Sequence, residues 1–454
     1  MKNQDVLRSY YDLVSQNEEL LLSDFDNFMK DRTEKIFKVT NSKPFKILQQ
    51  PNFINNELLE NIKLFSSSFF KLVNKVYELY EVNLEIREMF KLNKLFENLY
   101  LINQVYSVNF PIVRIDMFFL ESGEYKICEI NADGAGGLHK DTIINNYLLN
   151  SNVFKSLHKT YDIYTYNIID NLVIESLNIY ANFQKLYSSK KVPTVAVLNF
   201  QETNNVEEST MIKEYFEKKG CKAFVLSPND LTYNDGFVYF KEDQINLVFK
   251  EVINERLLNE YKDVRKFMQA VNENKLCMVG NVKSEVLDNK ILFSILHNKK
   301  FQCFLKQNEI DFINKYFPFS FNLGDENLVL SNDVINNKDK YVLKALNTYH
   351  CKGVFIGKLY NNTEWKFIVN DSWNNGFIAQ EFIENIPQKY LYIDNNCLSV
   401  EEFSVIDGLF FYNEKFSGIF SRASKDLLIS GSGNNDRHLG NIFYRDNTEA
   451  FYDK

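Results

Sequence analysis

The strongest constraint on the fold is a pair of strand-like runs in FPIVRIDMFFLESGEYKICEINADGAGG, residues 110–137. Ser122 and Gly123 separate the two runs, and a two-residue turn at this point would join them as a β-hairpin. With that turn at the centre, Asp116 lies directly opposite Glu129. Side chains alternate between the two faces of a strand, so this pair and its neighbours two residues away would share one face.

The charges on that face call for a compensating ion. Two carboxylates placed directly opposite each other are destabilising, and a hard cation such as Mg²⁺, which takes oxygen ligands, removes the conflict. Asp116, Glu129 and the Asn131 amide oxygen would supply metal ligands, and Arg114, opposite Asn131, would pair with a phosphate. The alternative is a surface hairpin with a charged outer face. The metal site also depends on the assumed register, because a one-residue slip would scatter the four side chains over both faces.

The composition is that of an ordinary globular protein. The 454 residues include 45% hydrophobic and 25% charged residues, and the formal net charge is −8. Such an acidic chain is not expected to bind nucleic acid. The six cysteines form no CxxC pair, and neither a signal-peptide pattern nor an apolar run of about eighteen residues is recognisable. We therefore expect free thiols, a cytoplasmic location and no membrane partner.

Four regions are predicted along the chain. They are a helical N-terminal region at 1–104, the hairpin followed by helix at 105–190, a βαβ domain at 191–285, and strands and loops at 286–454. Apolar residues in the first region recur at helical intervals: Leu58, Ile62, Phe65, Phe69 and Leu72. In the third region, VPTVAVLNF and KAFVLS flank a helical stretch that stops at Gly220, which predicts a parallel sheet. Neither GxGxxG nor GxxxxGK[ST] occurs, so no dinucleotide or P-loop site is expected.

The hairpin pattern, R-x-D followed by E-x-N-A-D, resembles a motif of the glutathionylspermidine synthetase family. The resemblance implies an α/β fold with a circularly permuted ATP-grasp domain and a Rossmann-like pre-ATP-grasp βαβ domain. It also implies that Arg114 contacts the transferred phosphate and that magnesium is bound by the other three motif residues, Asp116, Glu129 and Asn131. Further short matches follow in the family's order, between about residues 105 and 425.

The later matches concern the nucleotide. VLDNKILFSILHN resembles the family's Asn-Lys helix start, and YVLKAL resembles the strand of its second lysine, which implies that Lys290 and Lys344 bind ATP. The glycine-rich loop that follows reads NTYHCKGVFIG here; Gly353 remains, but the family's arginine is missing. GFIAQEFI resembles the strand that holds adenine and ribose, and its matched residues are Gln380, Glu381 and Ile383.

FSGIFSRAS resembles the family's G-x-x-x-R-E element, which implies that Arg422 is a second guanidinium on the transferred phosphate; Ala423 replaces the glutamate. Taken together, the resemblance implies ATP and Mg²⁺ as cofactors and a ligase that couples a carboxylate to an amine through an acyl phosphate. The identities of the small-molecule or peptide acid and of the amine stay open, as does the oligomeric state. Gly134, Gly136 and Gly137 predict either an anion cradle or a tight turn.

Two other functions are compatible with the sequence. DRHLGNI is similar to the catalytic loop of lipid-kinase-like enzymes, in which Asp436 would orient a hydroxyl nucleophile while Asn441 and Asp453 would bind metal. A non-catalytic nucleotide-binding protein is the other alternative, suggested by the altered loop after Lys344 and by Ala423. The charged set on the hairpin argues against it, because binding alone does not need such an array.

Overall fold

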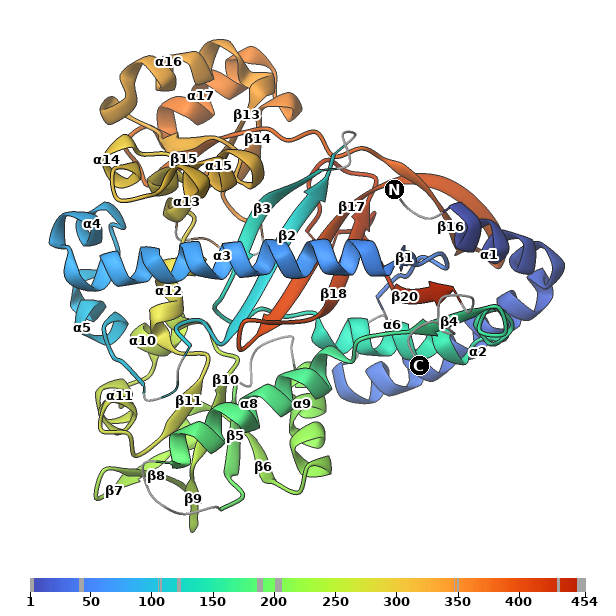
Figure 1. The fold of residues 1–454 in the computed structure, drawn as a ribbon, viewed down its shortest axis with the longest axis horizontal. Coiled ribbons are helices and arrows are strands. Elements are labelled where there is room, and N and C mark those ends of the chain that lie inside the picture. The colour runs from blue at the N-terminus through green and yellow to red at the C-terminus, as the bar shows by residue number, and fades with distance from the viewer. Residues whose placement is uncertain are drawn as a thin grey trace.

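The computed structural model describes residues 4–40, 45–104, 106, 108–120, 124–185, 191–200, 206–346, 348, 351–430 and 433–446. Figure 1 shows an antiparallel sheet in the middle of the molecule, a parallel sheet with its helices below it, and a smaller antiparallel sheet with its helices above it. The mixed α/β class predicted from the sequence is confirmed, since helices alternate with both parallel and antiparallel strands.

The central sheet has the strand order β19-β18-β17-β2-β3, and β16 pairs with the first half of β17. Its strands are β2 (Ile112–Phe119), β3 (Tyr125–Asn131), β16 (Gln388–Asp394), β17 (Cys397–Tyr412), β18 (Lys415–Ser424) and β19 (Arg437–Leu439). All neighbours are antiparallel. Because β2 pairs with β17, the sheet brings the hairpin next to strands that lie almost three hundred residues later.

The strands β2 and β3 form the predicted hairpin. The predicted register is confirmed at its polar end, where the pairs are Arg114–Asn131 and Asp116–Glu129. The next pair is Met117–Ile127, so Cys128 is the extra residue of a β-bulge, and from there toward the turn the pairing differs by one residue from the prediction. The predicted turn at Ser122 and Gly123 lies outside the described residues.

The N-terminal region is mainly helical, as predicted. Its helices are α1 (Gln4–Gln16), α2 (Glu18–Thr40), α3 (Asn56–Val82), α4 (Leu84–Met89) and α5 (Glu97–Tyr100). α3 begins after Asn55, whose side chain accepts a hydrogen bond from the Leu58 N–H and so caps the helix. The apolar face of α3 is buried, and Phe70 on that face contacts Phe411 of β17. The helix therefore covers one face of the central sheet (Figure 1).

The predicted parallel sheet is confirmed, with the order β11-β10-β5-β6. Its strands are β5 (Thr194–Leu198), β6 (Lys222–Leu226), β10 (Leu247–Lys250) and β11 (Cys277–Val279). The helices around it are α8 (Ile168–Gln184), α9 (Val206–Lys218), α10 (Asn254–Glu260) and α11 (Val264–Asn272), and a meander is formed by β7 (Thr232–Asn234), β8 (Phe237–Phe240) and β9 (Asp243–Ile245). β5, α9 and β6 make the expected βαβ unit, and Gly220 follows the helix with φ +85°.

The prediction of strands and loops from residue 286 onward is wrong in part. The expected strands β13 (Tyr341–Ala345), β14 (Val354–Ile356) and β15 (Phe377–Glu381) are present and form an antiparallel sheet with β12 (Ser320–Asn322). One helix in this region, α13 (Ile291–Leu296), follows Lys290, where the resemblance implied a helix start. The missed helices are α12 (Glu285–Asp288), α14 (Lys299–Gln302), α15 (Gln307–Tyr316), α16 (Leu328–Asn336) and α17 (Asn362–Ser372). α12, α13 and α14 have four to six residues, whereas α15, α16 and α17 have nine to eleven. Asn361 and Glu364 form a capping box at the start of α17.

A three-stranded sheet connects parts of the chain that are far apart in sequence, in the order β1 (Asn52–Ile54), β20 (Asn441–Asp446) and β4 (Tyr161–Tyr164). Beside it lie α6 (Leu138–Asn150) and α7 (Asn152–Leu157), and α6 also packs on β18 and β19. β4 corrects the expectation of continuous helix after the hairpin. Short 3-10 segments are Lys94–Phe96, Pro228–Asp230, Val282–Ser284, Asp325–Asn327, Lys338–Lys340 and Gly357–Leu359.

Two expectations about the whole chain can be compared with the structure. No helix within the described residues is long and apolar enough to cross a membrane. All six cysteines are free thiols, as expected. The boundaries of the four predicted regions stay predictions.

Candidate nucleotide and phosphate site

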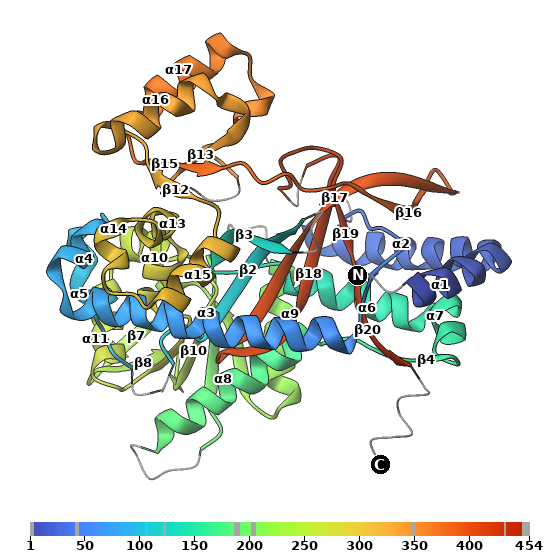
Figure 2. The same cartoon turned by 45° about the horizontal axis from the view of Figure 1, so that its top comes forward.

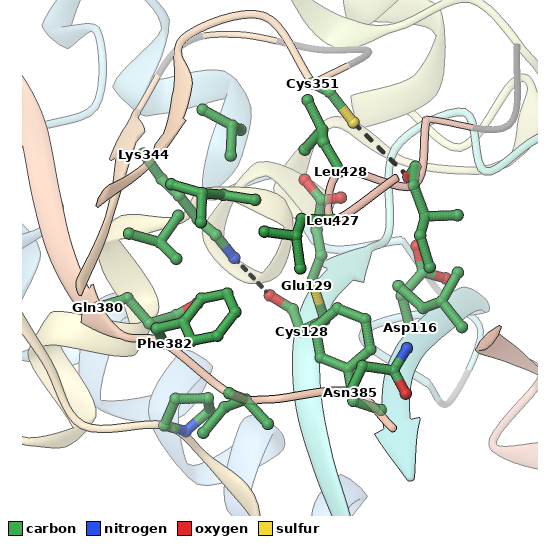
Figure 3. A pocket seen from close by; sticks show the side chains of 18 of the residues that line it. Asp116, Cys128, Glu129, Lys344, Cys351, Gln380, Phe382, Asn385, Leu427 and Leu428 are labelled. Atoms are coloured by element: carbon green, nitrogen blue, oxygen red, sulfur yellow. Dashed lines mark hydrogen bonds between the residues drawn. The ribbon is translucent and has the colours of Figure 1, made fainter. Parts of the chain in front are cut away.

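A pocket lies between the central sheet and the β12–β15 sheet, which stands above it in Figure 2. The pocket is open to solvent and has a volume of about 1010 Å³. Figure 3 shows side chains that line it. Eight of the eleven site residues predicted from the sequence line it: Asp116, Glu129, Lys290, Lys344, Gln380, Glu381, Ile383 and Arg422. The pocket therefore collects residues from β2, β3, β13, β15, β18 and the segment before α13.

Asp116 is fully buried on β2 and is held by two guanidinium groups. Arg114 donates from Nε to Oδ1 at 2.7 Å and from Nη2 to Oδ2 at 3.0 Å, while Arg422 donates from Nη2 to Oδ2 at 2.6 Å. The Asn131 amide adds a hydrogen bond of 3.2 Å to Oδ2. Burial by itself raises the pKa of Asp116, but the two guanidinium groups outweigh it and lower the pKa below its usual value. This carboxylate is therefore ionised at neutral pH.

The two predicted lysines contact the other strand of the hairpin. Lys290 Nζ lies 3.2 Å from Glu129 Oε1 and donates to the Thr348 carbonyl at 2.8 Å. Lys344 donates to the Cys128 carbonyl at 2.8 Å, the contact marked in Figure 3. Since Cys128 is the unpaired residue of the bulge, its carbonyl is available to the lysine. The bulge thus connects β3 to β13 across the pocket.

Apolar side chains from both sheets, and from the segment that follows β18, also line the pocket. They are Val342, Ile356, Phe382, Ile406, Leu427, Leu428 and Ile429. Two polar lining residues of β15 are held by β12 and the residue before it: Gln380 Nε2 donates to Ser320 Oγ at 3.1 Å, and the Glu381 N–H donates to the Phe319 carbonyl at 2.8 Å. An apolar slot with few fixed polar groups suits a flat heterocycle.

Three predicted site residues do not line the pocket. Arg114 and Asn131 lie behind Asp116 and contact it from β2 and β3. Gly353 stands at the start of β14 with φ +67°, and its carbonyl accepts from the Ala345 N–H at 2.9 Å. A Cβ at Gly353 would lie 2.7 Å from the Ala345 Cβ, so the glycine serves the turn between β13 and β14.

Sequence reasoning missed several residues of this site. Thr348, Cys351 and Lys352, from the loop after β13, line the pocket, and Lys352 adds another cation to it. Gly408 of β17 lies opposite Asp116, where a Cβ would be 2.8 Å from Arg114 Cδ. A glycine inside the strand-like run VIDGLFF is a recognised sign of close approach, so this signal was available in the sequence.

The glycine stretch after the hairpin forms a cradle that the protein's own carboxylate fills. The N–H groups of Gly137 and His139 donate to Glu208 Oε2 of α9 at 3.0 and 3.1 Å. Gly137 has φ +101°, and a Cβ there would overlap the Phe420 ring. The two predicted alternatives, an anion cradle and a tight turn, therefore both describe this stretch.

The two cysteines of the pocket are not poised as nucleophiles. Burial raises the pKa of Cys128 to about 11, and burial also raises the pKa of Cys351. Because the thiolate is the reactive form, both thiols are unreactive at neutral pH.

The oxygen donors of the pocket fit a hard cation in their chemistry. Asp116 and Glu129 supply carboxylates, and the Asn131 amide lies against Asp116. Across the described part of the chain, no group of three or more His, Cys, Asp or Glu side chains is placed to hold a metal ion. Two carboxylates would therefore need an amide, water or phosphate oxygen beside them. Both Asp116 oxygens already accept from guanidinium groups, so one of these groups must turn to another anion when a cation binds.

The DRHLGNI segment is divided between two sheets and does not face the pocket. Asp436 precedes β19, and its Oδ2 accepts from the Gly433 N–H at 2.7 Å. Asn441 begins β20; it is buried, and its amide donates to the Ile419 carbonyl at 2.9 Å. Neither residue lines the pocket, and Asp453 lies outside the described residues. This geometry argues against the kinase hypothesis.

Among solved structures, the chain is similar to a glutathione synthetase-like effector from Globodera pallida in its apo form. The sequence identity is 12%, the TM-score is 0.57, and the similarity covers 94% of this chain and 97% of that one, so the two share a fold. A protein assigned as a gamma-glutamylcysteine synthetase from Methylobacillus flagellatus gives 9% identity and a TM-score of 0.40 over 84% of this chain and 87% of that one, which is too weak to indicate a common fold. No protein-family profile and no curated protein matches the chain.

Proposed function

We propose that the chain is an ATP-dependent ligase that phosphorylates a carboxylate and couples the resulting acyl phosphate to an amine, releasing ADP and phosphate. A carboxylate is a poor electrophile at neutral pH, and phosphorylation makes its carbon open to attack by an amine. Phosphoryl transfer depends mainly on positioning and on neutralising the charge of the phosphate oxygens. A protein with this function needs converging cations rather than a nucleophile of its own.

The observation that carries the proposal is the convergence of cations on two carboxylates in one pocket. Asp116 and Glu129 come from the hairpin, while Lys290, Lys344 and Arg422 come from three other elements. A surface hairpin with a charged outer face would leave these groups in solvent. Here Asp116 is fully buried, and the two guanidinium groups that contact it offset the cost of burying its charge.

The contacts suggest how the site would accept a nucleotide. Each cation is held by an acceptor in the pocket wall: Lys290 by Glu129, Lys344 by the Cys128 carbonyl, and Arg422 by Asp116. In the proposal, phosphate oxygens replace these acceptors, with the lysines on the α- and β-phosphates and Arg114 and Arg422 on the transferred group. Asp116 and Glu129, with Asn131, would then hold Mg²⁺, which neutralises phosphate charge when bound.

The proposed architecture is an ATP-grasp fold in circularly permuted order, with the parallel sheet as the pre-ATP-grasp domain. The nucleotide would lie between the central sheet and the β12–β15 sheet, with adenine and ribose against Gln380, Glu381 and Ile383. The position of the pocket between the two sheets supports this arrangement, as does the fold shared with the glutathione synthetase-like effector. The division at residues 104, 190 and 285 is part of the same proposal.

The altered residue beside Arg422 does not favour a non-catalytic binding protein. Ala423 is fully buried and packs with Leu48, Tyr390 and Leu439 on the side of β18 that faces away from Arg422. The alanine therefore removes no charge from the pocket of this chain. The pocket keeps the acidic pair and its cations, which simple nucleotide binding does not require.

Trapping of the acyl phosphate tests the proposal. The protein would be incubated with MgATP, a library of carboxylic acids and hydroxylamine, and both ADP and hydroxamate would be measured. We expect acid-dependent hydroxamate that matches ADP in amount. MgATP binding without acid-dependent ADP release would instead support a nucleotide-binding protein.

A further inference from the structure

We propose that Asp288 is a positioning residue that holds the metal-binding end of β3 in place against the segment that carries Lys290. The inference rests on the proposed function, because that function assigns Glu129 and Asn131 to the metal and Lys290 to the nucleotide. Asp288 itself does not line the pocket. It would therefore affect MgATP only through the residues that it positions.

The side chain of Asp288 joins two segments that are far apart in the sequence. Asp288 is the last residue of α12, and its Oδ1 accepts hydrogen bonds from the Ala132 N–H at 2.7 Å and the Asp133 N–H at 3.0 Å. These two N–H groups directly follow Asn131, the last residue of β3. One carboxylate oxygen therefore fixes the backbone at the point where the strand ends.

Lys290 returns to the same strand two residues after Asp288. Its Nζ lies 3.2 Å from Glu129 Oε1 and donates to the Thr348 carbonyl at 2.8 Å. This segment therefore contacts β3 twice, first through Asp288 at the backbone after Asn131 and then through the lysine at Glu129. Without the first contact, the strand end and the lysine are free to move apart. Groups that must meet the same MgATP would then be misplaced, and small displacements of such groups are costly.

The parallel sheet holds the same strand end from another side. Asp133 forms a fully buried ion pair with Lys250 of β10, and its Oδ2 accepts from the Asn254 N–H at 2.5 Å. Lys250 also donates to the Val252 carbonyl at 2.9 Å. The side chain of Asp133 is thus held independently of its N–H group. Loss of Asp288 would release the strand end from α12 and leave it attached to the parallel sheet, so we expect such a variant to fold.

Three substitutions of Asp288 separate the position of its oxygen from its charge. Asp288→Asn keeps an oxygen that can accept from both N–H groups and removes the charge. Asp288→Glu keeps the charge and moves the carboxylate by one methylene group, whereas Asp288→Ala removes the acceptor. Asn55→Ala is the matched control, because Asn55 Oδ1 accepts from the Leu58 N–H at 2.9 Å at the start of α3 and does not line the pocket.

Binding of a non-hydrolysable ATP analogue would be measured by calorimetry over a series of Mg²⁺ concentrations, together with urea unfolding of each protein. We expect Asp288→Ala and Asp288→Glu to weaken binding at saturating Mg²⁺ by at least about tenfold, which is typical when the support of a metal ligand is removed. Both should also raise the Mg²⁺ concentration that gives half-maximal binding. Asp288→Asn should bind as the wild type does, and Asn55→Ala should lose stability without a change in binding.

Wild-type affinity in Asp288→Ala, or in Asp288→Glu if the alanine variant does not fold, would overturn the inference. Equally weak binding by Asp288→Asn and Asp288→Ala would overturn it too, as would a loss of affinity of that size in Asn55→Ala. The ligase function is tested separately by hydroxamate formation in the wild type, and it stands or falls by that result whatever the variants show. A wild type that binds no analogue would overturn both.

Discussion

Arg422 on β18 donates its Nη2 to Asp116 Oδ2 at 2.6 Å, although β17 separates their strands in the central sheet. The residue of β17 directly opposite Asp116 is Gly408. A Cβ at Gly408 would lie 2.8 Å from Arg114 Cδ and 3.0 Å from Asp116 Oδ1. The absence of a side chain at this position therefore allows three charged groups from β2 and β18 to meet above β17.

Replacement of Gly408 by alanine is expected to destabilise the protein by about 1–3 kcal/mol, because the added methyl group overlaps a packed ion pair. It should also weaken MgATP binding, since Arg114 and Asp116 must shift. Chemical denaturation and calorimetry measure the two effects. Gly220→Ala is a suitable control: no atom lies within 4 Å of its Cβ, so it should cost only about 1 kcal/mol for the positive φ and leave MgATP binding unchanged. Unaltered MgATP affinity in Gly408→Ala would contradict this account.

Asparagine in place of Asp116 should lower ADP release at least about 100-fold, the loss typical of removing one group that organises a transition-state charge. The buried guanidinium groups of Arg114 and Arg422 would lose their counter-charge, so circular dichroism must show that the variant is folded. Asp436→Asn is the matched comparison, because Asp436 does not line the pocket and accepts hydrogen bonds from the Ser430 hydroxyl and the Gly433 N–H. It should keep ADP release within about twofold of wild type. The reverse ranking of the two variants would favour the kinase hypothesis.

The polar end of the hairpin was predictable because its information is local. Alternation along two adjacent strands and one turn signal placed Asp116 opposite Glu129, as the structure has them. The bulge at Cys128 was not predicted, although the two buried isoleucines on either side of it, Ile127 and Ile130, are three residues apart and so break strict alternation. It moved the pairing only on the turn side, so the assignment of the polar residues to one face was unaffected.

The rest of the site depends on contacts between distant segments. The approach of Arg422 to Asp116 follows from the strand order of the central sheet, and the sequence holds no direct record of that order. The helices α15, α16 and α17 were missed although they have nine to eleven residues, and the capping box of Asn361 and Glu364 was a signal for the last of them.

Removal of either pocket lysine should weaken nucleotide binding. Lys290→Gln and Lys344→Gln are each expected to raise the dissociation constant of MgATP by about tenfold or more, because a charge-assisted hydrogen bond to phosphate contributes roughly 1.5–3 kcal/mol. Lys358→Gln serves as the control, since this lysine pairs with the exposed Glu384 at 3.1 Å and does not line the pocket. If Lys290→Gln or Lys344→Gln binds MgATP as tightly as the control does, that lysine does not bind the nucleotide, which would contradict the proposal.

A buried acidic cluster beneath the hairpin gives a prediction for stability against pH. Asp133, directly after β3, forms a fully buried ion pair with Lys250 of β10. Asp288 accepts from the Asp133 N–H at 3.0 Å, and Glu285 lies one helical turn earlier on α12. Burial, with the charge of Asp133, raises the pKa of Glu285 to about 7 from a reference value of 4.5. The cluster therefore holds a proton on Glu285 over a range in which the unfolded chain has lost it.

The sign of the effect follows from which state binds the proton. Below about pH 4.5 Glu285 is protonated in both states, and above pH 7 it is ionised in both, so its contribution changes only between these values. Within that window the folded state binds more protons, and its stability falls as the pH rises, by up to roughly 3 kcal/mol in total. The Glu285→Gln variant cannot ionise at this position. Its free energy of unfolding should therefore rise relative to that of the wild type between pH 5 and pH 8. Urea titrations of both proteins at several pH values measure the difference, and parallel curves would show that Glu285 ionises with its ordinary pKa.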